Sequence, residues 1–69
     1  MHNELTRQDI ELMQKELDYR RLELKPRLIE AVKEARAFGD LSENFEYKAA
    51  KKEKNQNDSR IRYLENMIS

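Results

Sequence analysis

The sequence predicts an all-α protein, folded as an antiparallel two-helix coiled-coil hairpin. Two long stretches carry apolar residues at steps of three and four, the spacing that aligns side chains along one stripe of a helix. The only glycine, Gly39, separates these stretches, and glycine ends helices readily because it adopts positive φ without a steric penalty. Charged residues make up 41% of the chain, which is typical of long solvated helices and not of sheets.

Composition sets limits on the class of protein. The 69 residues suffice for one small domain, taken as residues 1–69. Lys and Arg number 14, as do Asp and Glu, so the net charge gives no indication of a nucleic-acid or membrane partner. The absence of cysteine excludes disulfides and thiolate zinc sites. No apolar run approaches the roughly 20 residues of a membrane span, and no secretory signal pattern opens the chain. We therefore expect a cytoplasmic protein without a membrane partner.

The first helix is expected over about residues 6–38. Thr6 is suited to be its N-cap, and Asp9 places an acid in the first turn. Pro26 interrupts the helix, but the apolar period continues in phase across it. We therefore predict a kink within one helix, the alternative being two shorter helices that meet at residues 24–25. The apolar stripe consists of Ile10, Met13, Leu17, Leu24, Leu28, Ala31, Ala35 and Phe38.

The second helix is expected over about residues 42–68, after a turn at residues 39–42. If the two helices are antiparallel, Leu64 should face Leu17 and Ala50 should face Ala31. Asn57 is a polar member of the contact stripe, and it either fixes the register or lies beside space opened by Pro26. The stripe, called the seam below, consists of Tyr47, Ala50, Lys54, Asn57, Ile61, Leu64 and Ile68.

The bend between the helices displays two acids. Asp40 or Ser42 can cap the second helix, because their side-chain oxygens accept from free backbone N–H groups. Asp40 and Glu43 are three residues apart, so on a first helical turn they share one face. The pair suits a capping box, and it also suits a shared Mg²⁺, which needs only one or two carboxylates beside water and phosphate. Spacing alone favours capping.

The bend and its flanks resemble a known family, the amino-terminal coiled-coil domain of the bacterial Gre factors GreA and GreB, and most closely that of GreA. The family pattern is E-A-R, two variable residues, G-D-L-S-E-N-x-E-Y, and then x-A-A. The chain matches it over residues 34–36, 39–47 and 48–50. The likeness extends outward through Glu16-Leu17, Lys25-Pro26 and Arg60-Ile61, and so spans nearly the whole chain without a gap.

This resemblance implies a transcription elongation factor that inserts its hairpin into the secondary channel of bacterial RNA polymerase. There it stimulates Mg²⁺-dependent cleavage of backtracked RNA near its 3′ end. The domain is then an accessory factor and not itself an enzyme. By the same likeness, Asp40 and Glu43 handle the metal and the attacking water, with Ser42 as a helper. The Mg²⁺ is shared with the polymerase and is not expected in the isolated domain. DNA binding is also implied.

Six further residues are expected to contact RNA or polymerase: Leu41, Asn44, Phe45, Lys48, Lys51 and Lys52. The three lysines match a basic patch of the family, the alternative being a solvated face paired with acids such as Glu53. Phe45 stands where the family usually has a small residue. Its ring can contact the polymerase or pack under the bend, and we favour packing.

Two alternatives to cleavage stay open. Related channel-binding coiled coils inhibit polymerase without cleaving RNA, and a hairpin can also be a structural coiled coil that dimerises. Because an isolated hairpin of this size is marginally stable, self-association is a further expectation. The family's carboxy-terminal FKBP-like domain is absent from the 69 residues. We therefore expect either an excised domain or a naturally short relative, with weak affinity for polymerase.

Overall fold

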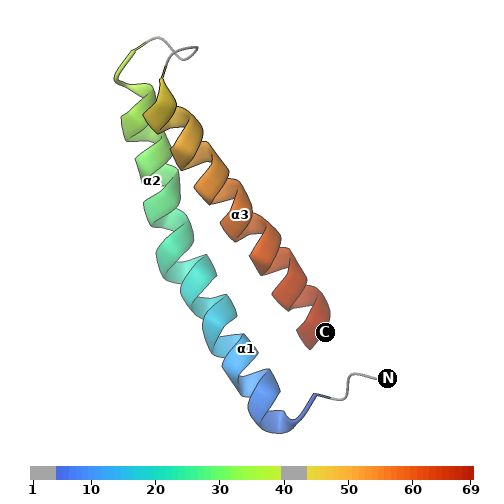
Figure 1. Cartoon of the computed structure of the whole chain (residues 1–69). Helices are drawn as coiled ribbons and strands as arrows, with labels where there is room; N and C mark the ends of the chain where they lie inside the picture. The colour runs from blue at the N-terminus through green and yellow to red at the C-terminus, as the bar shows by residue number, and fades with distance from the viewer. Residues whose placement is uncertain (1–4, 40–43) are drawn as a thin grey trace.

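The structure, a computed structural model, describes residues 5–39 and 44–69 and is an antiparallel helical hairpin (Figure 1). One arm contains α1 (Arg7–Tyr19), the π-helical segment η1 (Arg20–Leu24) and α2 (Lys25–Arg36), and α3 (Phe45–Ile68) returns beside it. The molecule is a rod with principal extents of 48 × 25 × 13 Å. The described residues therefore confirm the predicted all-α hairpin.

The first helix begins where the sequence predicts. Thr6 is the N-cap of α1, and its Oγ1 accepts a hydrogen bond of 3.0 Å from the backbone N–H of Asp9. In return, the Asp9 carboxylate accepts from the Thr6 N–H at 3.2 Å. This reciprocal pair is a capping box, and it satisfies two donors that would otherwise lack partners at the helix start.

Pro26 is accommodated by a wider helical turn directly before it. In η1 the N–H of Lys25 donates to the carbonyl of Arg20, five residues back. Pro26 has no N–H, and in a regular α-helix its ring would crowd the carbonyl of Leu22. The wider π turn relieves that crowding while the helical path continues from Arg7 to Arg36. The prediction of one continuous helix is confirmed, and that of two separate helices is wrong.

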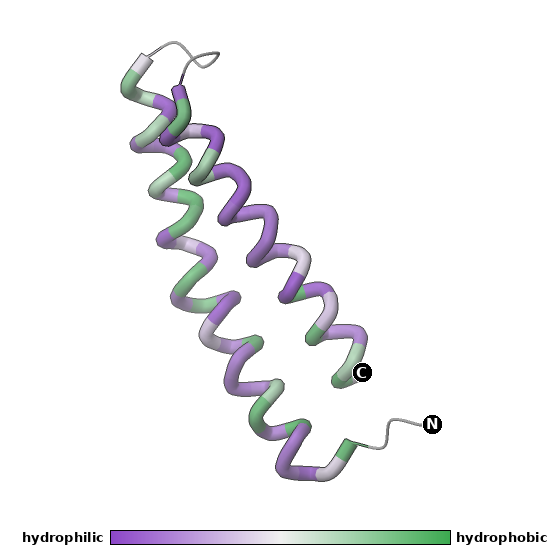
Figure 2. The backbone as a smooth tube through the Cα atoms, in the orientation of Figure 1, coloured by the Kyte–Doolittle hydropathy of each residue, from purple (hydrophilic) through white to green (hydrophobic). Residues whose placement is uncertain are grey.

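The core is a narrow strip between the two arms. Leu17, Ile61 and Leu64 form a buried cluster, with Met13 and Ile68 packed against it. Leu64 has no exposed surface, and Leu28 and Ala35 are also buried. Leu17 and Leu64 thus lie together as predicted. Figure 2 shows the hydrophobic residues interspersed along the first arm, whereas the half of α3 near the bend is mostly hydrophilic.

The predicted apolar stripe of the first arm is buried less completely than the seam of α3. Every member of the α3 seam is buried or half-buried, but Ile10, Ala31 and Phe38 of the first arm are exposed. Phe38 lies beyond the last residue of α2, so helical spacing no longer sets its direction. Ala31 is displaced by the larger Val32, which is half-buried on the step of four from Leu28. The predicted burial of Ala31 in the contact stripe is therefore wrong.

The segment between the end of α2 and the start of α3 is longer than predicted. α2 stops at Arg36, not at residue 38, because its last turn tightens through bonds from Phe38 N to Ala35 O and from Gly39 N to Arg36 O. Gly39 has φ +127, which fits its predicted role at the helix end. α3 starts at Phe45, not at residue 42, and its N-cap is Asn44. The prediction that Asp40 or Ser42 caps this helix is wrong.

Candidate functional site

The predicted acidic site falls in the segment that joins the two arms. Asp40, Leu41, Ser42 and Glu43 lie outside the described residues. The described residues on either side define the two helix ends that this segment connects. Gly39 follows α2 at one end, and Asn44 precedes α3 at the other.

Asn44 holds these two helix ends together. Its Oδ1 accepts a hydrogen bond of 2.9 Å from the N–H of Tyr47, which caps α3. Its Nδ2 donates to the carbonyl of Ala35, in the last turn of α2, at 2.6 Å. We call this pair of bonds the Asn44 bridge. From sequence, Asn44 was expected only as a contact residue; its high N-cap propensity was the signal for the capping half of this role.

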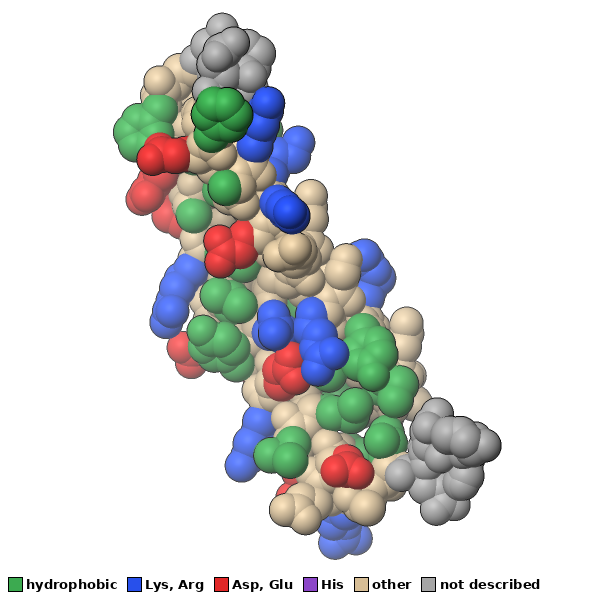
Figure 3. Space-filling view, in the orientation of Figure 1, with side chains coloured by type: hydrophobic (Ala, Val, Ile, Leu, Met, Phe, Trp, Pro, Cys, Tyr) green, Lys and Arg blue, Asp and Glu red, His purple; other side chains and the backbone are tan. Residues whose placement is uncertain are grey.

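Phe45 is exposed next to the bend. Its side chain is 76% exposed, so the prediction that it packs beneath the bend is wrong. The ring sits two positions before Tyr47, where the seam begins, and so points away from the first arm. The Lys48 ammonium lies 5.7 Å from the ring centroid, and Phe38 across the bend is 73% exposed. Figure 3 shows hydrophobic and basic side chains together at this end of the rod.

Tyr47 brings cations from both arms to the same ring. It is half-buried, as its predicted seam position requires. The Arg36 guanidinium lies 5.9 Å from the ring centroid and the Lys51 ammonium 5.5 Å from it. Both distances are within the range of cation–π attraction. The ring therefore partly offsets the repulsion between two positive groups near the bend.

The predicted basic patch lies on the early turns of α3. Lys48, Lys51 and Lys52 are exposed, and with Tyr47 they line a shallow groove of about 700 Å³. Within residues 5–39 and 44–69, none of the three forms an ion pair, with Glu53 or with any other acid. The patch thus presents positive charge to solvent.

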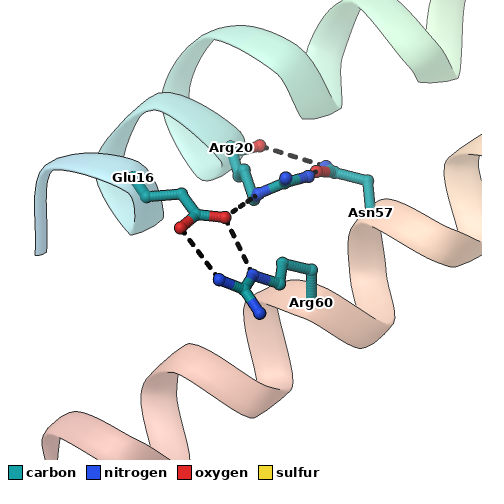
Figure 4. A network of polar contacts seen from close by, with 4 residues as sticks. All are labelled: Glu16, Arg20, Asn57 and Arg60. Carbon is teal, nitrogen blue, oxygen red and sulfur yellow. Dashed lines mark hydrogen bonds and ion pairs between the residues drawn. The ribbon is translucent and has the colours of Figure 1, made fainter. Parts of the chain in front are cut away.

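A second polar cluster joins the arms away from the bend (Figure 4). Arg60 donates to both oxygens of Glu16, at 2.8 and 3.1 Å, and Arg20 donates to the same carboxylate at 2.7 Å. These hydrogen bonds, that of Arg60 foremost, lower the pKa of Glu16 from 4.5 to about 2. The same contact raises the pKa of Arg60. This cluster was not predicted from sequence, although the (i, i+4) spacing of Glu16 and Arg20 was a visible signal for half of it.

Asn57 completes that cluster. It is 3% exposed, and its Nδ2 donates to the carbonyl of Arg20 at 3.2 Å while its Oδ1 accepts from the Arg20 guanidinium at 2.8 Å. Arg20 is the first residue of η1, so Asn57 pairs with the wide turn that precedes Pro26. The two expectations for Asn57 therefore coincide: it bonds across the arms at one defined position, and that position is beside the proline-induced turn.

The described residues do not by themselves assemble a metal site. Outside segments 1–4 and 40–43, no three His, Cys, Asp or Glu side chains are grouped as ligands. Asp40 and Glu43, the predicted metal-binding acids, lie outside these residues, and two carboxylates suit Mg²⁺ only if other ligands complete its shell. In the described ranges, no helix is long and apolar enough to cross a bilayer.

Comparison with known proteins identifies the family. The model of the GreA/GreB amino-terminal family, "Transcription elongation factor, N-terminal", matches residues 3–69. The chain is similar to "Transcription elongation factor GreA" of Sinorhizobium medicae, with 54% identity over 57 residues, 83% of this chain and 36% of that protein. It is also 48% identical to the factor of the same name from Bartonella tribocorum over 65 residues, 94% of this chain and 41% of that protein.

The match covers most of this chain but a smaller part of each relative. The chain spans between 36% and 41% of the length of these two curated relatives. No solved structure matches it significantly. The family match, in contrast, covers both arms of the hairpin and the segment between them. The chain therefore belongs to the GreA/GreB family of transcription elongation factor amino-terminal domains.

Proposed function

We propose that this chain is the part of a transcription elongation factor that enters the secondary channel of bacterial RNA polymerase and stimulates cleavage of backtracked RNA. The observation that carries the proposal is where the family motif falls in the fold. The family match covers residues 3–69, and the acids of the motif lie in the segment that connects α2 to α3 at one end of a slender rod. Groups at the end of such a rod can reach a site that a globular domain cannot enter.

The acids have a defined chemical role in this proposal. Asp40 and Glu43 share Mg²⁺ with the polymerase and orient the attacking water, and Ser42 helps to position them. When bound, Mg²⁺ supplies electrostatic stabilisation of the attacking or leaving oxygen in the hydrolysis of the phosphodiester. Two carboxylates leave most of the coordination shell to water, substrate and polymerase. The chain is therefore an accessory factor, and the catalytic centre is that of the polymerase.

The basic patch on α3 would contact the backtracked RNA. Lys48, Lys51 and Lys52 are exposed and free of ion pairs in the described part of the chain, so their charge is available to phosphates. Phe45 adds an exposed ring beside Lys48, suited to contact a base or an apolar wall of the channel. Leu41 would make a similar contact from the connecting segment.

The test uses a chimera, because the chain covers only 36% of the Sinorhizobium medicae relative. Residues 3–69 replace the matching segment of that GreA, which supplies the remainder of a full-length factor. The chimera is added to backtracked elongation complexes with labelled RNA. We expect Mg²⁺-dependent shortening of the RNA, lost in Asp40→Asn or Glu43→Gln while polymerase binding persists. Glu46→Gln removes one exposed acid from the first turn of α3 and should leave cleavage intact.

Two other outcomes would reject cleavage. Polymerase binding without RNA shortening would indicate a channel-binding inhibitor. Absence of polymerase binding, together with concentration-dependent self-association of the 69-residue chain, would indicate a structural dimer. One observation favours this dimer as the second candidate: Leu12 is 59% and Leu22 is 70% exposed on the first arm, which leaves apolar surface for a second copy.

A further inference from the structure

We infer that Asn44 is a positioning residue for RNA cleavage: by bonding α2 and α3 at the bend, it fixes the separation of the two helix ends that carry the acidic segment. This inference rests on the proposed function and assigns Asn44 a different role from the contact with RNA or polymerase expected from sequence. It follows from the two hydrogen bonds of one side chain and from the lack, among the described residues, of another hydrogen bond between α2 and α3 near them.

Both ends of the Asn44 amide are used. The oxygen accepts from Tyr47 N at 2.9 Å, and the nitrogen donates to Ala35 O at 2.6 Å. The amide of asparagine carries its acceptor and its donor on two different atoms, so one short side chain can bond two separate backbone groups at once. Aspartate could reproduce only the first bond, since an ionised carboxylate cannot donate. Serine could also cap α3, but it has no second polar atom with which to reach α2.

No other hydrogen bond between described residues joins α2 to α3 near the bend. Among the described residues, the remaining hydrogen bonds and ion pairs between the arms involve residues 16–25 of the first arm and 57–65 of α3. The contact of this kind nearest the bend is the ion pair of Lys25 with Asp58, at 3.7 Å. Near the bend, the Arg36 guanidinium faces the Tyr47 ring at 5.9 Å without a hydrogen bond to it. In the described part of the chain, the bond from Asn44 to Ala35 is thus the hydrogen bond that joins the two arms at this end of the rod.

The sequence links the bridge directly to the acids. Glu43 directly precedes Asn44 in the chain. Asp40 directly follows Gly39, which lies three residues after the end of α2. A change in the separation of the helix ends therefore changes where these two residues begin. Displacing a reacting group by about 1 Å can slow an enzymatic reaction by about 100-fold. Loss of the bridge should consequently slow cleavage more than it weakens binding.

Asn44→Asp separates the two halves of the bridge. Aspartate is about as good an N-cap as asparagine, so α3 keeps its cap, but the donor to Ala35 is lost. In the chimera we expect the maximal cleavage rate to fall about 10- to 100-fold, with the half-saturating factor concentration changed less than about twofold. Asn44→Ser should behave alike without adding charge. Asn66→Asp, the same chemical change at an exposed position of α3, should have no effect.

Two results of this assay would overturn the inference. One is cleavage at the parent rate by Asn44→Asp or Asn44→Ser. The other is a raised half-saturating concentration with an unchanged maximal rate, because that would make Asn44 a binding contact and not a positioning residue. A general structural defect would be visible as a lowered midpoint of thermal unfolding in Asn44→Asp, which the retained cap predicts to be small.

A second measurement does not depend on cleavage. The chain has no cysteine, so Phe38→Cys and Phe45→Cys, both at exposed positions flanking the bend, accept one spin label each. Pulsed electron paramagnetic resonance measures the distance between the two spin labels. We expect a narrow distance distribution, which Asn44→Asp broadens and Asn66→Asp leaves unchanged. An unbroadened distribution overturns the inference. The two measurements can also disagree. If Asn44→Asp broadens the distances but the parent chimera does not cleave RNA, the proposed function is refuted, whereas the positioning of the helix ends by Asn44 is supported.

Discussion

Replacing Glu16 by glutamine should destabilise the hairpin at neutral pH and have little effect near pH 2. The Glu16 carboxylate accepts three hydrogen bonds, two from Arg60 across the arms and one from Arg20 within its own arm. These contacts lower its pKa from 4.5 to about 2. Because the folded-state pKa lies below the unfolded one, the stabilisation is complete above about pH 4.5 and is lost as the pH falls toward 2.

The size of the effect follows from the pKa difference and from solvent exposure. Each pKa unit corresponds to about 1.4 kcal/mol, which sets a ceiling of about 3 kcal/mol for this shift. The Glu16 side chain is 32% exposed and Arg60 is 44% exposed, so solvent screens much of that energy. Exposed ion pairs typically contribute 1 kcal/mol or less, and we expect about 1 kcal/mol for Glu16→Gln at neutral pH.

Urea unfolding followed by far-ultraviolet circular dichroism measures this difference in unfolding free energy. The parent and Glu16→Gln are compared at neutral pH and again at about pH 2. Taking the difference between the two proteins at each pH cancels the titration of the other carboxylates. Glu23→Gln is the matched control, because Glu23 pairs with Arg27 at 3.7 Å with both side chains more than 60% exposed. It should change stability by less than about 0.5 kcal/mol. A Glu16→Gln effect that is equal at both pH values would refute the reasoning.

Two further substitutions test the core and the buried amide. Leu64→Ala should lower the free energy of unfolding by about 2–5 kcal/mol. That loss is comparable to the whole stability of a domain this small, so thermal melts should show a mostly unfolded chain. Leu22→Ala, at a side chain that is 70% exposed, should melt like the parent. Asn57→Ala removes both bonds to Arg20 and should cost about 1–3 kcal/mol in urea unfolding, whereas Asn55→Ala, exposed on the same helix, should cost nothing. An equal loss in the two asparagine variants would contradict the assigned role of Asn57.

The sequence was sufficient to predict the buried face of α3 and its end at Ile68, but not its start at Phe45. Its seam from Tyr47 to Ile68 is buried or half-buried at every predicted position. This follows because α3 is one uninterrupted helix, so a single period holds along its length. The capping box of Thr6 and Asp9 was predictable for a similar reason, since all of its atoms belong to residues close in sequence.

The predictions failed where the outcome depends on contacts between residues far apart in sequence. Asp40, Ser42 and Asn44 all have good N-cap propensity, and local sequence cannot decide among them. Asn44 is the N-cap in the structure, and it also reaches Ala35 on the other arm. The cluster of Glu16 with Arg60 was missed for the same reason, because it joins residues 44 positions apart. Such contacts depend on the register of the two arms, which propensities do not specify.

That register is set largely by polar contacts. The apolar core contains few buried side chains, so it specifies the register only in part. Sliding one helix along the other would remove Glu16 from Arg60 and would leave the buried amide of Asn57 without Arg20, which is expensive for a group that is 3% exposed. The polar cluster therefore fixes how far α3 extends along the first arm. At the bend itself, the Asn44 bridge sets the separation between the end of α2 and the start of α3.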